Sequence, residues 1–272
     1  MPADLPALLA DLSAETEDLR AILDSLAEPD WQLPTSAPGW AIADQVSHLA
    51  YFDEVAVISA TDADAFAALL DSANAAGGVS PDAIAMQYRD RAGAQLLGWF
   101  GQTRRDLLRV FAGLDPAARV PWFGPPMSVA SSLTARLMET WAHGQDIADT
   151  LGVQRVPTAR LRHVAHIGVG ARAFSYTAHS LRPPDTPVRV ELTGPSGETW
   201  TWGPDDAADR VTGPALDFCL LVTQRRHRDD TAVTAIGNGA RQWLSIAQSF
   251  AGPPGPGRQP GQFAGPPWLT RL

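Results

Sequence analysis

The chain has 272 residues, of which 45% are hydrophobic and 19% charged, so it can bury the core of one large domain or of two ordinary ones. This composition excludes a disordered chain. The formal net charge of -9 argues against a nucleic-acid partner, because an acidic surface repels the phosphate backbone.

Nothing in the sequence resembles an export signal or a membrane span. The first twenty residues are acidic where a secretory signal would be basic and then apolar. No apolar run approaches the roughly 18 residues that cross a bilayer. The single cysteine, Cys219, cannot form an intrachain disulfide, and we expect it to be a buried, inert thiol. We therefore expect a cytoplasmic protein with no membrane partner, either a monomer or a homodimer.

Apolar residues recur at helical spacing through the first half of the chain. The pattern predicts helices over residues 5–26, 40–61, 81–114 and 128–151, the third opening at Pro81 and the fourth ending before Gly152. The arginines of the third helix, Arg104 among them, are expected to form a solvated face. We predict an N-terminal, all-α four-helix bundle over residues 1–153.

The pattern changes beyond Pro157. Residues 188–192 and 198–202 alternate apolar and polar side chains, which predicts two strands of a hairpin. Helices are expected through His163 and His166, over 214–223 and over about 239–250. We predict a smaller α/β (α+β) domain over residues 154–252, followed by a tail rich in Gly and Pro over residues 253–272.

Glu139 and His143 are four residues apart on a predicted helix, so both side chains project from one face. Zinc accepts imidazole nitrogen and carboxylate oxygen, and His48 on the second predicted helix offers a third ligand. The pair alone also fits a solvated helix surface, and helical projection turns it away from the main apolar stripe. His48 falls on a second apolar face, which fits a ligand pocket or a buried histidine bonded to a carbonyl. The nearby acids Asp44 and Asp146 are expected on the helix surface, and the alternative is that either carboxylate orients the histidine beside it.

Trp40 precedes His48-Leu-Ala by eight residues, and Glu139-Thr-Trp-Ala-His143-Gly-Gln-Asp follows later in the chain. This arrangement resembles the metal-binding N-terminal domain of the mycothiol-dependent maleylpyruvate isomerase family, within the DinB-like superfamily. The resemblance implies a bundle that holds one divalent metal, most readily zinc, through His48, Glu139 and His143. The predicted strand pair, the helix through Cys219 and the turn at Arg225-Arg-His-Arg228 look like that family's sterol-carrier-like C-terminal domain.

The resemblance further implies an enzyme that uses a low-molecular-weight thiol such as mycothiol. The metal would lower the thiol's pKa, and the thiolate would add to an electrophilic or anionic small molecule, as in an isomerase or an S-transferase. Arg225 and Arg226 are candidates for binding the substrate carboxylate or enolate, although basic side chains also suit a helix C-terminus. Two alternatives stay open: a metal-assisted hydrolase, lyase or secondary-metabolism enzyme that activates water or substrate directly, and a non-enzymatic protein that binds a small ligand or metal.

Overall fold

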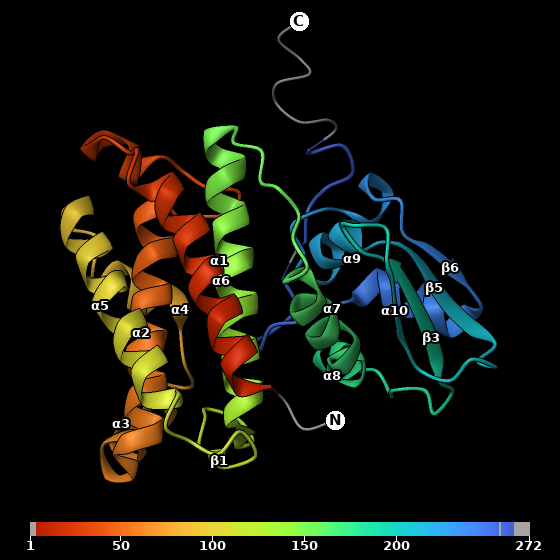
Figure 1. The fold of residues 1–272 in the computed structure, drawn as a ribbon, viewed down its shortest axis with the longest axis horizontal. Helices are drawn as coiled ribbons and strands as arrows, with labels where there is room; N and C mark the ends of the chain where they lie inside the picture. The colour runs from red at the N-terminus through yellow and green to blue at the C-terminus, as the bar shows by residue number, and fades with distance from the viewer. Residues whose placement is uncertain (1–3, 256, 264–272) are drawn as a thin grey trace, which may run out of the picture. The chain divides into compact units, whose positions relative to one another are not determined.

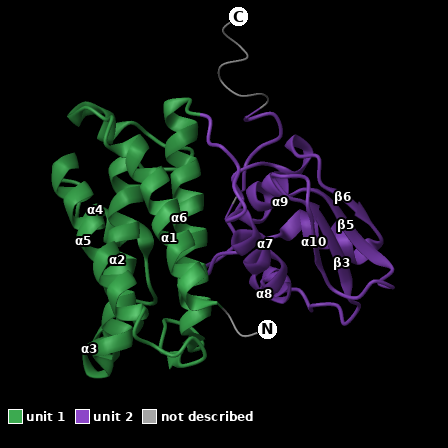
Figure 2. Cartoon of the chain, in the orientation of Figure 1, with its two compact units in different colours: residues 1–153 green, residues 154–272 purple. Residues whose placement is uncertain are grey.

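The computed structural model describes residues 4–255 and 257–263. The chain divides into two compact units, residues 1–153 and 154–272 (Figure 2). The first unit is helical, whereas the second combines helices with a sheet, which confirms the predicted fold class. Of the predicted tail over residues 253–272, residues 256 and 264–272 lie outside the described part of the chain.

Unit 1 is built on four long helices, α1 (Leu5–Leu23), α2 (Ile42–Thr61), α5 (Gly93–Phe111) and α6 (Val129–Leu151), which lie side by side in Figure 1. The side chain of Asp4 caps the start of α1 and that of Ser128 caps α6. Gly152 ends α6 in the left-handed conformation, with a φ of 67°. The core between these helices includes Leu19, Ile42, Val46, Leu49, Leu96 and Phe100.

The helix predicted over residues 81–114 is wrong as a single element, because it consists of α4 (Pro81–Met86) and α5. Gly93 opens α5 against the indole of Trp31, so closely that an added Cβ would lie 2.2 Å from the ring nitrogen. Its N–H donates to the Glu28 carboxylate at 2.9 Å. The contact with the 3-10 turn at Glu28–Gln32 fixes where α5 begins, and the chain turns over residues 87–92 to reach it.

Three further elements of unit 1 were not predicted. Helix α3 (Ala63–Ala75) follows α2, and only Phe66 among its side chains is buried. Strands β1 (Arg119–Val120) and β2 (Met127–Ser128) form a short antiparallel pair just before α6. Between α3 and α4, the exposed Gly77-Gly78 pair turns the chain with positive φ at both residues.

Arg104 lies inside the bundle, with 2% of its surface exposed, so the expectation that it belongs to a solvated face was wrong. Its Nε donates to the Asp53 carboxylate of α2 at 2.6 Å, and its Nη2 donates to the Thr140 hydroxyl of α6 at 2.9 Å. Its Nη1 donates to the hydroxyl of Thr16 on α1. A single guanidinium on α5 therefore links all four long helices, and its charge is buried because Asp53 neutralises it.

Unit 2 contains a four-stranded sheet in the order β4-β3-β5-β6. Strand β3 (Val188–Thr193) pairs antiparallel with β4 (Thr199–Trp202), which confirms the predicted hairpin, and parallel with β5 (Asp209–Pro214). Strand β6 (Thr234–Ile236) pairs antiparallel with β5. The helices of this unit are α7 (Leu161–Gly170), α8 (Arg172–Ala178), α9 (Ala215–Val222) and α10 (Asn238–Ile246), with a short 3-10 turn at Arg228–Asp230.

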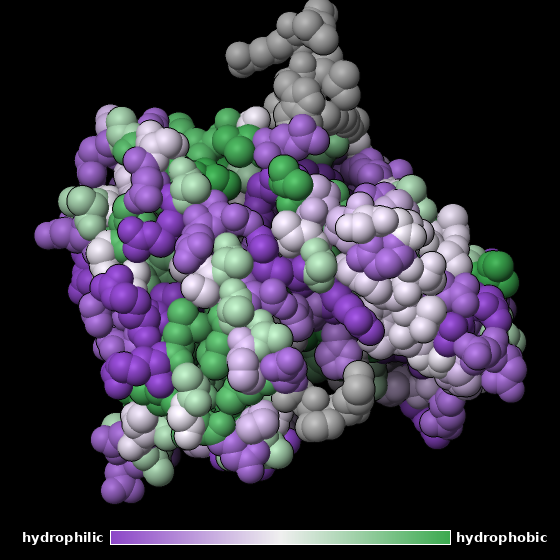
Figure 3. Space-filling model, viewed as in Figure 1, coloured by the Kyte–Doolittle hydropathy of each residue, from purple (hydrophilic) through white to green (hydrophobic). Residues whose placement is uncertain are grey.

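The core of unit 2 lies between the sheet and these helices. Val190, Val211, Phe218 and Trp243 are each 0% exposed, and the Trp243 ring meets the Phe218 ring edge to face at 5.9 Å between centroids. No described helix is both long and apolar enough to cross a membrane. On the face drawn in Figure 3, hydrophobic side chains form small patches among hydrophilic ones.

Candidate metal centre

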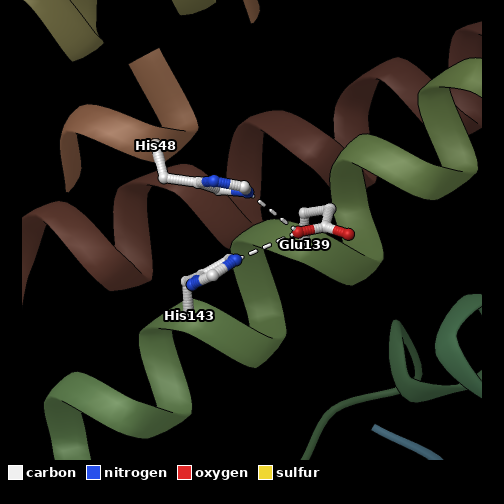
Figure 4. Close-up of side chains that lie close together, drawn as sticks. All are labelled: His48, Glu139 and His143. Carbon is white, nitrogen blue, oxygen red and sulfur yellow. Dashed lines mark hydrogen bonds and ion pairs between the residues drawn. The ribbon is translucent and has the colours of Figure 1, made fainter. Parts of the chain in front are cut away.

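His48 lies on α2, and Glu139 and His143 lie one turn apart on α6. Both helices belong to the bundle, and Figure 4 shows the two imidazoles, one above the other on the left of the view, both pointing at the Glu139 carboxylate. His48 is 8% exposed and His143 is 9% exposed, while the Glu139 side chain is 17% exposed. Helical projection favoured an exposed position for Glu139 and His143, and that expectation was wrong, because a second face of α6 packs against α2.

The three side chains offer ligand atoms that all lie within 4.8 Å of one another. The Nε2 atom of His48 lies 3.3 Å from Glu139 Oε2, and the Nε2 atom of His143 lies 3.0 Å from the same oxygen. Two ligands that each bind one zinc ion at about 2.1 Å lie roughly 3.4 Å apart in a tetrahedral site. The distances of 3.3 Å and 3.0 Å from the two imidazoles to the carboxylate oxygen are therefore close to those between ligands that share one divalent cation.

Gln45 fixes the orientation of the His143 ring. The His143 Nδ1 is hydrogen-bonded to the Gln45 side-chain oxygen, and Gln45 Nε2 donates to the Thr35 hydroxyl at 2.8 Å. Since the amide nitrogen is already used as the donor to Thr35, its oxygen accepts, and the His143 proton sits on Nδ1. The other nitrogen of the ring, Nε2, faces the Glu139 carboxylate and is the one placed to bind a metal.

Burial governs the electrostatics of the site. Burial lowers the pKa of His48 to about 4, helped by the neighbouring His143 and opposed by Glu139, so His48 is neutral at pH 7. Burial by itself would raise the pKa of Glu139, but the hydrogen bonds to His143 and His48 outweigh it and hold that pKa well below its ordinary value. The site thus presents a neutral imidazole and an ionised carboxylate, which are the forms that bind a metal.

Aromatic rings enclose the imidazoles. The ring of Trp40 stacks on His143 with centroids 5.9 Å apart, and Phe52 packs on His48 at 4.6 Å. Arg136, one turn before Glu139 on α6, is 6% exposed, and its guanidinium carbon lies 5.8 Å from the centroids of the Phe52 and Trp122 rings. Its Nη1 is buried and has no hydrogen-bond partner among the described residues. The charge of Arg136 also lowers the pKa of Glu139.

The sequence did not single out Gln45 or Arg136 as parts of the site. Gln45 lies three residues before His48, on the same face of α2, and that spacing is the one signal that could have revealed it. Asp44 and Asp146 were expected on the surface, which was wrong, because they are 2% and 0% exposed. Both carboxylates are held by other groups: Asp44 pairs with the guanidinium of Arg89 at 2.9 Å, and Asp146 accepts a hydrogen bond from the Ser36 hydroxyl at 3.0 Å.

The other predicted site residues lie in unit 2. Arg225 and Arg226 follow the end of α9, and each donates from Nη1 to a backbone carbonyl, that of Thr223 and that of Arg225. Their role in substrate binding stays a prediction. Cys219 is fully buried on α9, and burial raises the pKa of its thiol, so this side chain supplies no thiolate at neutral pH.

Comparison with known proteins places these observations in a family. Residues 12–148 match the model of the mycothiol maleylpyruvate isomerase N-terminal domain, which confirms the resemblance predicted from the sequence, and residues 184–235 match the model named wyosine base formation. Two uncharacterized proteins of Mycobacterium tuberculosis, from strain CDC 1551 / Oshkosh and strain ATCC 25618 / H37Rv, are each 50% identical over 256 residues, which is 94% of this chain and 100% of theirs.

Two solved structures share the fold. They are a mycothiol-dependent maleylpyruvate isomerase and a histidine-to-alanine mutant of such an enzyme, with 16% and 14% sequence identity. The TM-score is 0.57 for both, and the alignments cover 86% of this chain and 93% of those chains. At this level of identity the likeness concerns the fold alone, and the chemistry has to be argued from the side chains.

Proposed function

Because the chain belongs to the mycothiol maleylpyruvate isomerase family, we propose that it is a metal-dependent enzyme that isomerises or S-conjugates a small electrophile with the help of a thiol. The metal ligands in this proposal are His48, Glu139 and His143, and zinc is the most suitable ion for two imidazoles and a carboxylate. The thiol cofactor is a low-molecular-weight thiol of the mycothiol type. We further propose that the enzyme works in the cytoplasm as a monomer or homodimer.

One observation carries the proposal. Both histidines direct Nε2 at a single carboxylate oxygen, at 3.3 Å and 3.0 Å, inside a mostly buried site. Gln45 accepts from Nδ1 of His143 and leaves Nε2 facing Glu139, which is the orientation that a shared metal ion needs. Three protein ligands leave a fourth position for a thiol, a water molecule or a substrate.

Each part of the site has a distinct task in this proposal. A bound zinc ion would lower the pKa of a thiol attached to it, so that a thiolate is present at neutral pH. Since Cys219 is buried and protonated, the thiol has to come from outside the chain. Arg136 offers a buried positive charge beside the triad, and Arg225 and Arg226 are further candidates for the carboxylate of an anionic substrate. Trp40 and Phe52 exclude water from the imidazoles.

Metal analysis of the purified full-length chain tests the first half of the proposal. We expect about one equivalent of divalent metal per chain, and loss of most of it in His48→Ala and in Glu139→Gln. Glu54→Gln is the matched control, because it makes the same chemical change at an exposed position of α2. Wild-type protein that is refolded with zinc and still binds none would end the proposal. Equal metal content in Glu139→Gln and Glu54→Gln would show that Glu139 is not a metal ligand and would contradict the proposed triad.

Turnover of maleylpyruvate, with and without added mycothiol, tests the second half. We expect zinc-loaded enzyme to form the trans isomer only when the thiol is present, and Glu139→Gln to be inactive. If a metal-bound chain transforms a substrate equally well without any thiol, the alternative of direct activation of water or substrate is favoured. A metal-bound chain with all four ligand positions filled by protein would favour the non-enzymatic alternative.

A further inference from the structure

Unit 2 contains a pocket of about 280 Å³ that is formed by residues of that unit alone. Its walls come from the end of α7, from α8, from strand β3 and from α10. Most of the lining is apolar or aromatic, and it includes Val169, Tyr176, Pro183, Pro184, Val190 and Trp243. Small-molecule sites have this character, a concave apolar surface with a few polar groups placed in it.

The polar group in this pocket is the guanidinium of Arg172, the first residue of α8. Its Nη1 donates to the backbone carbonyl of Thr186 at 3.0 Å, which holds the group in one orientation. Its Nε and Nη2 are buried and lack a well-placed acceptor within residues 4–255 and 257–263. The neighbouring hydroxyl is that of Tyr176, which donates to the Gly239 carbonyl, and whose pKa is raised by burial and lowered by the guanidinium. The guanidinium carbon lies 6.0 Å from the centroid of the Tyr176 ring. Trp243 lines the same pocket, and its indole N–H is likewise buried and unpartnered among the described residues.

Nε and Nη2 form one edge of the guanidinium, and their two parallel N–H bonds match the two oxygens of a carboxylate. An arginine cannot lose its proton inside a protein, so burying this edge without an acceptor costs free energy. A ligand whose carboxylate accepts hydrogen bonds from Nε and Nη2 would remove this cost. The orientation of the edge is already set by Thr186, so a ligand meets a site that needs no rearrangement.

We propose that unit 2 binds a small monocarboxylate with a compact aromatic or apolar body, its carboxylate paired side-on with Nε and Nη2 of Arg172. A monoanion suits the site better than a phosphate ester, because Arg172 is the only basic residue among the described residues that line the pocket. The proline and aromatic walls favour a ring over a flexible chain. This site is separate from the triad of unit 1, and the inference does not depend on the proposed function.

Phenylacetate is a suitable probe, and phenylacetamide is its uncharged match in shape. Titration of the full-length chain by isothermal calorimetry should give a Kd for phenylacetate on the order of 0.1 to 1 mM, as expected for a ligand of this size. Phenylacetamide should bind at least about 10-fold more weakly, because it cannot form the charge-assisted pair. The indole N–H resonance of Trp243, assigned from the spectrum of Trp243→Phe, should shift with phenylacetate.

Arg172→Gln should raise the Kd of phenylacetate about 10- to 100-fold, which is the loss expected when a charged donor is removed. Arg162→Gln, at an exposed position of α7 in the same unit, is the control and should leave the Kd unchanged. Gly170→Leu provides a second route that keeps Arg172. Gly170 lines the pocket and a Cβ there meets no atom within 4 Å, so the larger side chain should occupy the space and abolish binding.

The result that overturns the inference is equal binding of phenylacetate and phenylacetamide, or an equal Kd in Arg172→Gln and Arg162→Gln. Glu139→Gln separates this site from the triad of unit 1. Binding retained in Glu139→Gln supports a site in unit 2, whatever the fate of the proposed enzyme activity. Binding lost in Glu139→Gln and kept in Arg172→Gln would mean that the carboxylate binds at the triad instead.

Discussion

Replacing Arg104 by methionine should destabilise unit 1 more than any change to another arginine of α5. The side chains of Arg104 and Asp53 are 3% and 0% exposed, and their charged atoms lie 2.6 Å apart. Arg104→Met removes the only ion-pair partner that the described residues give Asp53 and leaves its carboxylate buried and uncompensated. Breaking such a pair costs about 3 to 5 kcal/mol, a large part of the roughly 5 to 15 kcal/mol that stabilises a typical domain.

The assay is native-state hydrogen exchange followed by mass spectrometry, because peptides from α2, α5 and α6 report on unit 1 separately from unit 2. We expect the opening free energy of these peptides to fall by about 4 kcal/mol in Arg104→Met. Arg109→Met is the control: its side chain is 71% exposed and pairs with Asp106 on the surface, so it should cost less than about 1 kcal/mol. The double variant Arg104→Met, Asp53→Leu should recover at least half of the loss. A cost below about 1 kcal/mol for Arg104→Met alone would refute this account of the bundle.

Three further predictions concern the bundle and its site. Gln45→Leu should raise the zinc Kd, measured by competition with a chelator, about 10- to 100-fold, because His143 loses the acceptor that fixes its ring. An unchanged Kd would contradict that role of Gln45. In the metal-free chain, the unfolding free energy should fall by up to about 1.4 kcal/mol per pH unit as the pH drops from about 6.5 to 4. The reason is that His48, with a folded pKa of about 4, takes up its proton more readily in the unfolded chain. Urea titrations at several pH values should show this loss in the wild type and lack the His48 component in His48→Gln. Gly93→Ala should lower the unfolding temperature, because the added Cβ clashes with the Trp31 indole at a cost of about 1 to 3 kcal/mol. Gly98→Ala on the same helix is the control: its Cβ meets no atom within 4 Å, so this variant should raise the unfolding temperature.

The sequence predicted those helices whose apolar residues recur along one face. Helices α1, α2 and α6 begin and end within a few residues of the expected positions, and for α1 and α6 the residues Asp4, Ser128 and Gly152 supply cap signals that act locally. Helix α3 is an exception, because Phe66, Leu69 and Leu70 lie at helical spacing although the helix was not predicted and only Phe66 is buried. The break before α5 depends on the contact between Gly93 and Trp31, two residues far apart in sequence, and no local pattern encodes it.

The candidate site was accessible to sequence reasoning only through the spacing of its histidines and glutamate. Hydrophobic periodicity argued against Glu139 and His143, because it detects the apolar face of a helix and not a polar face buried against another helix. Gln45, Arg104 and Arg136 are polar residues that are buried among partners from other helices. Their positions follow from pairing across the bundle, which a single sequence does not display.

The donors of the candidate centre are divided between distant stretches of one polypeptide. A chain severed at the exposed Gly77-Gly78 turn would leave His48 on one fragment, and Glu139 and His143 on the other. Neither fragment alone contains all three ligands, so metal binding by a mixture of the two fragments would show that they associate with α2 packed against α6. Metal binding by the two fragments would therefore serve as a measure of how the bundle assembles.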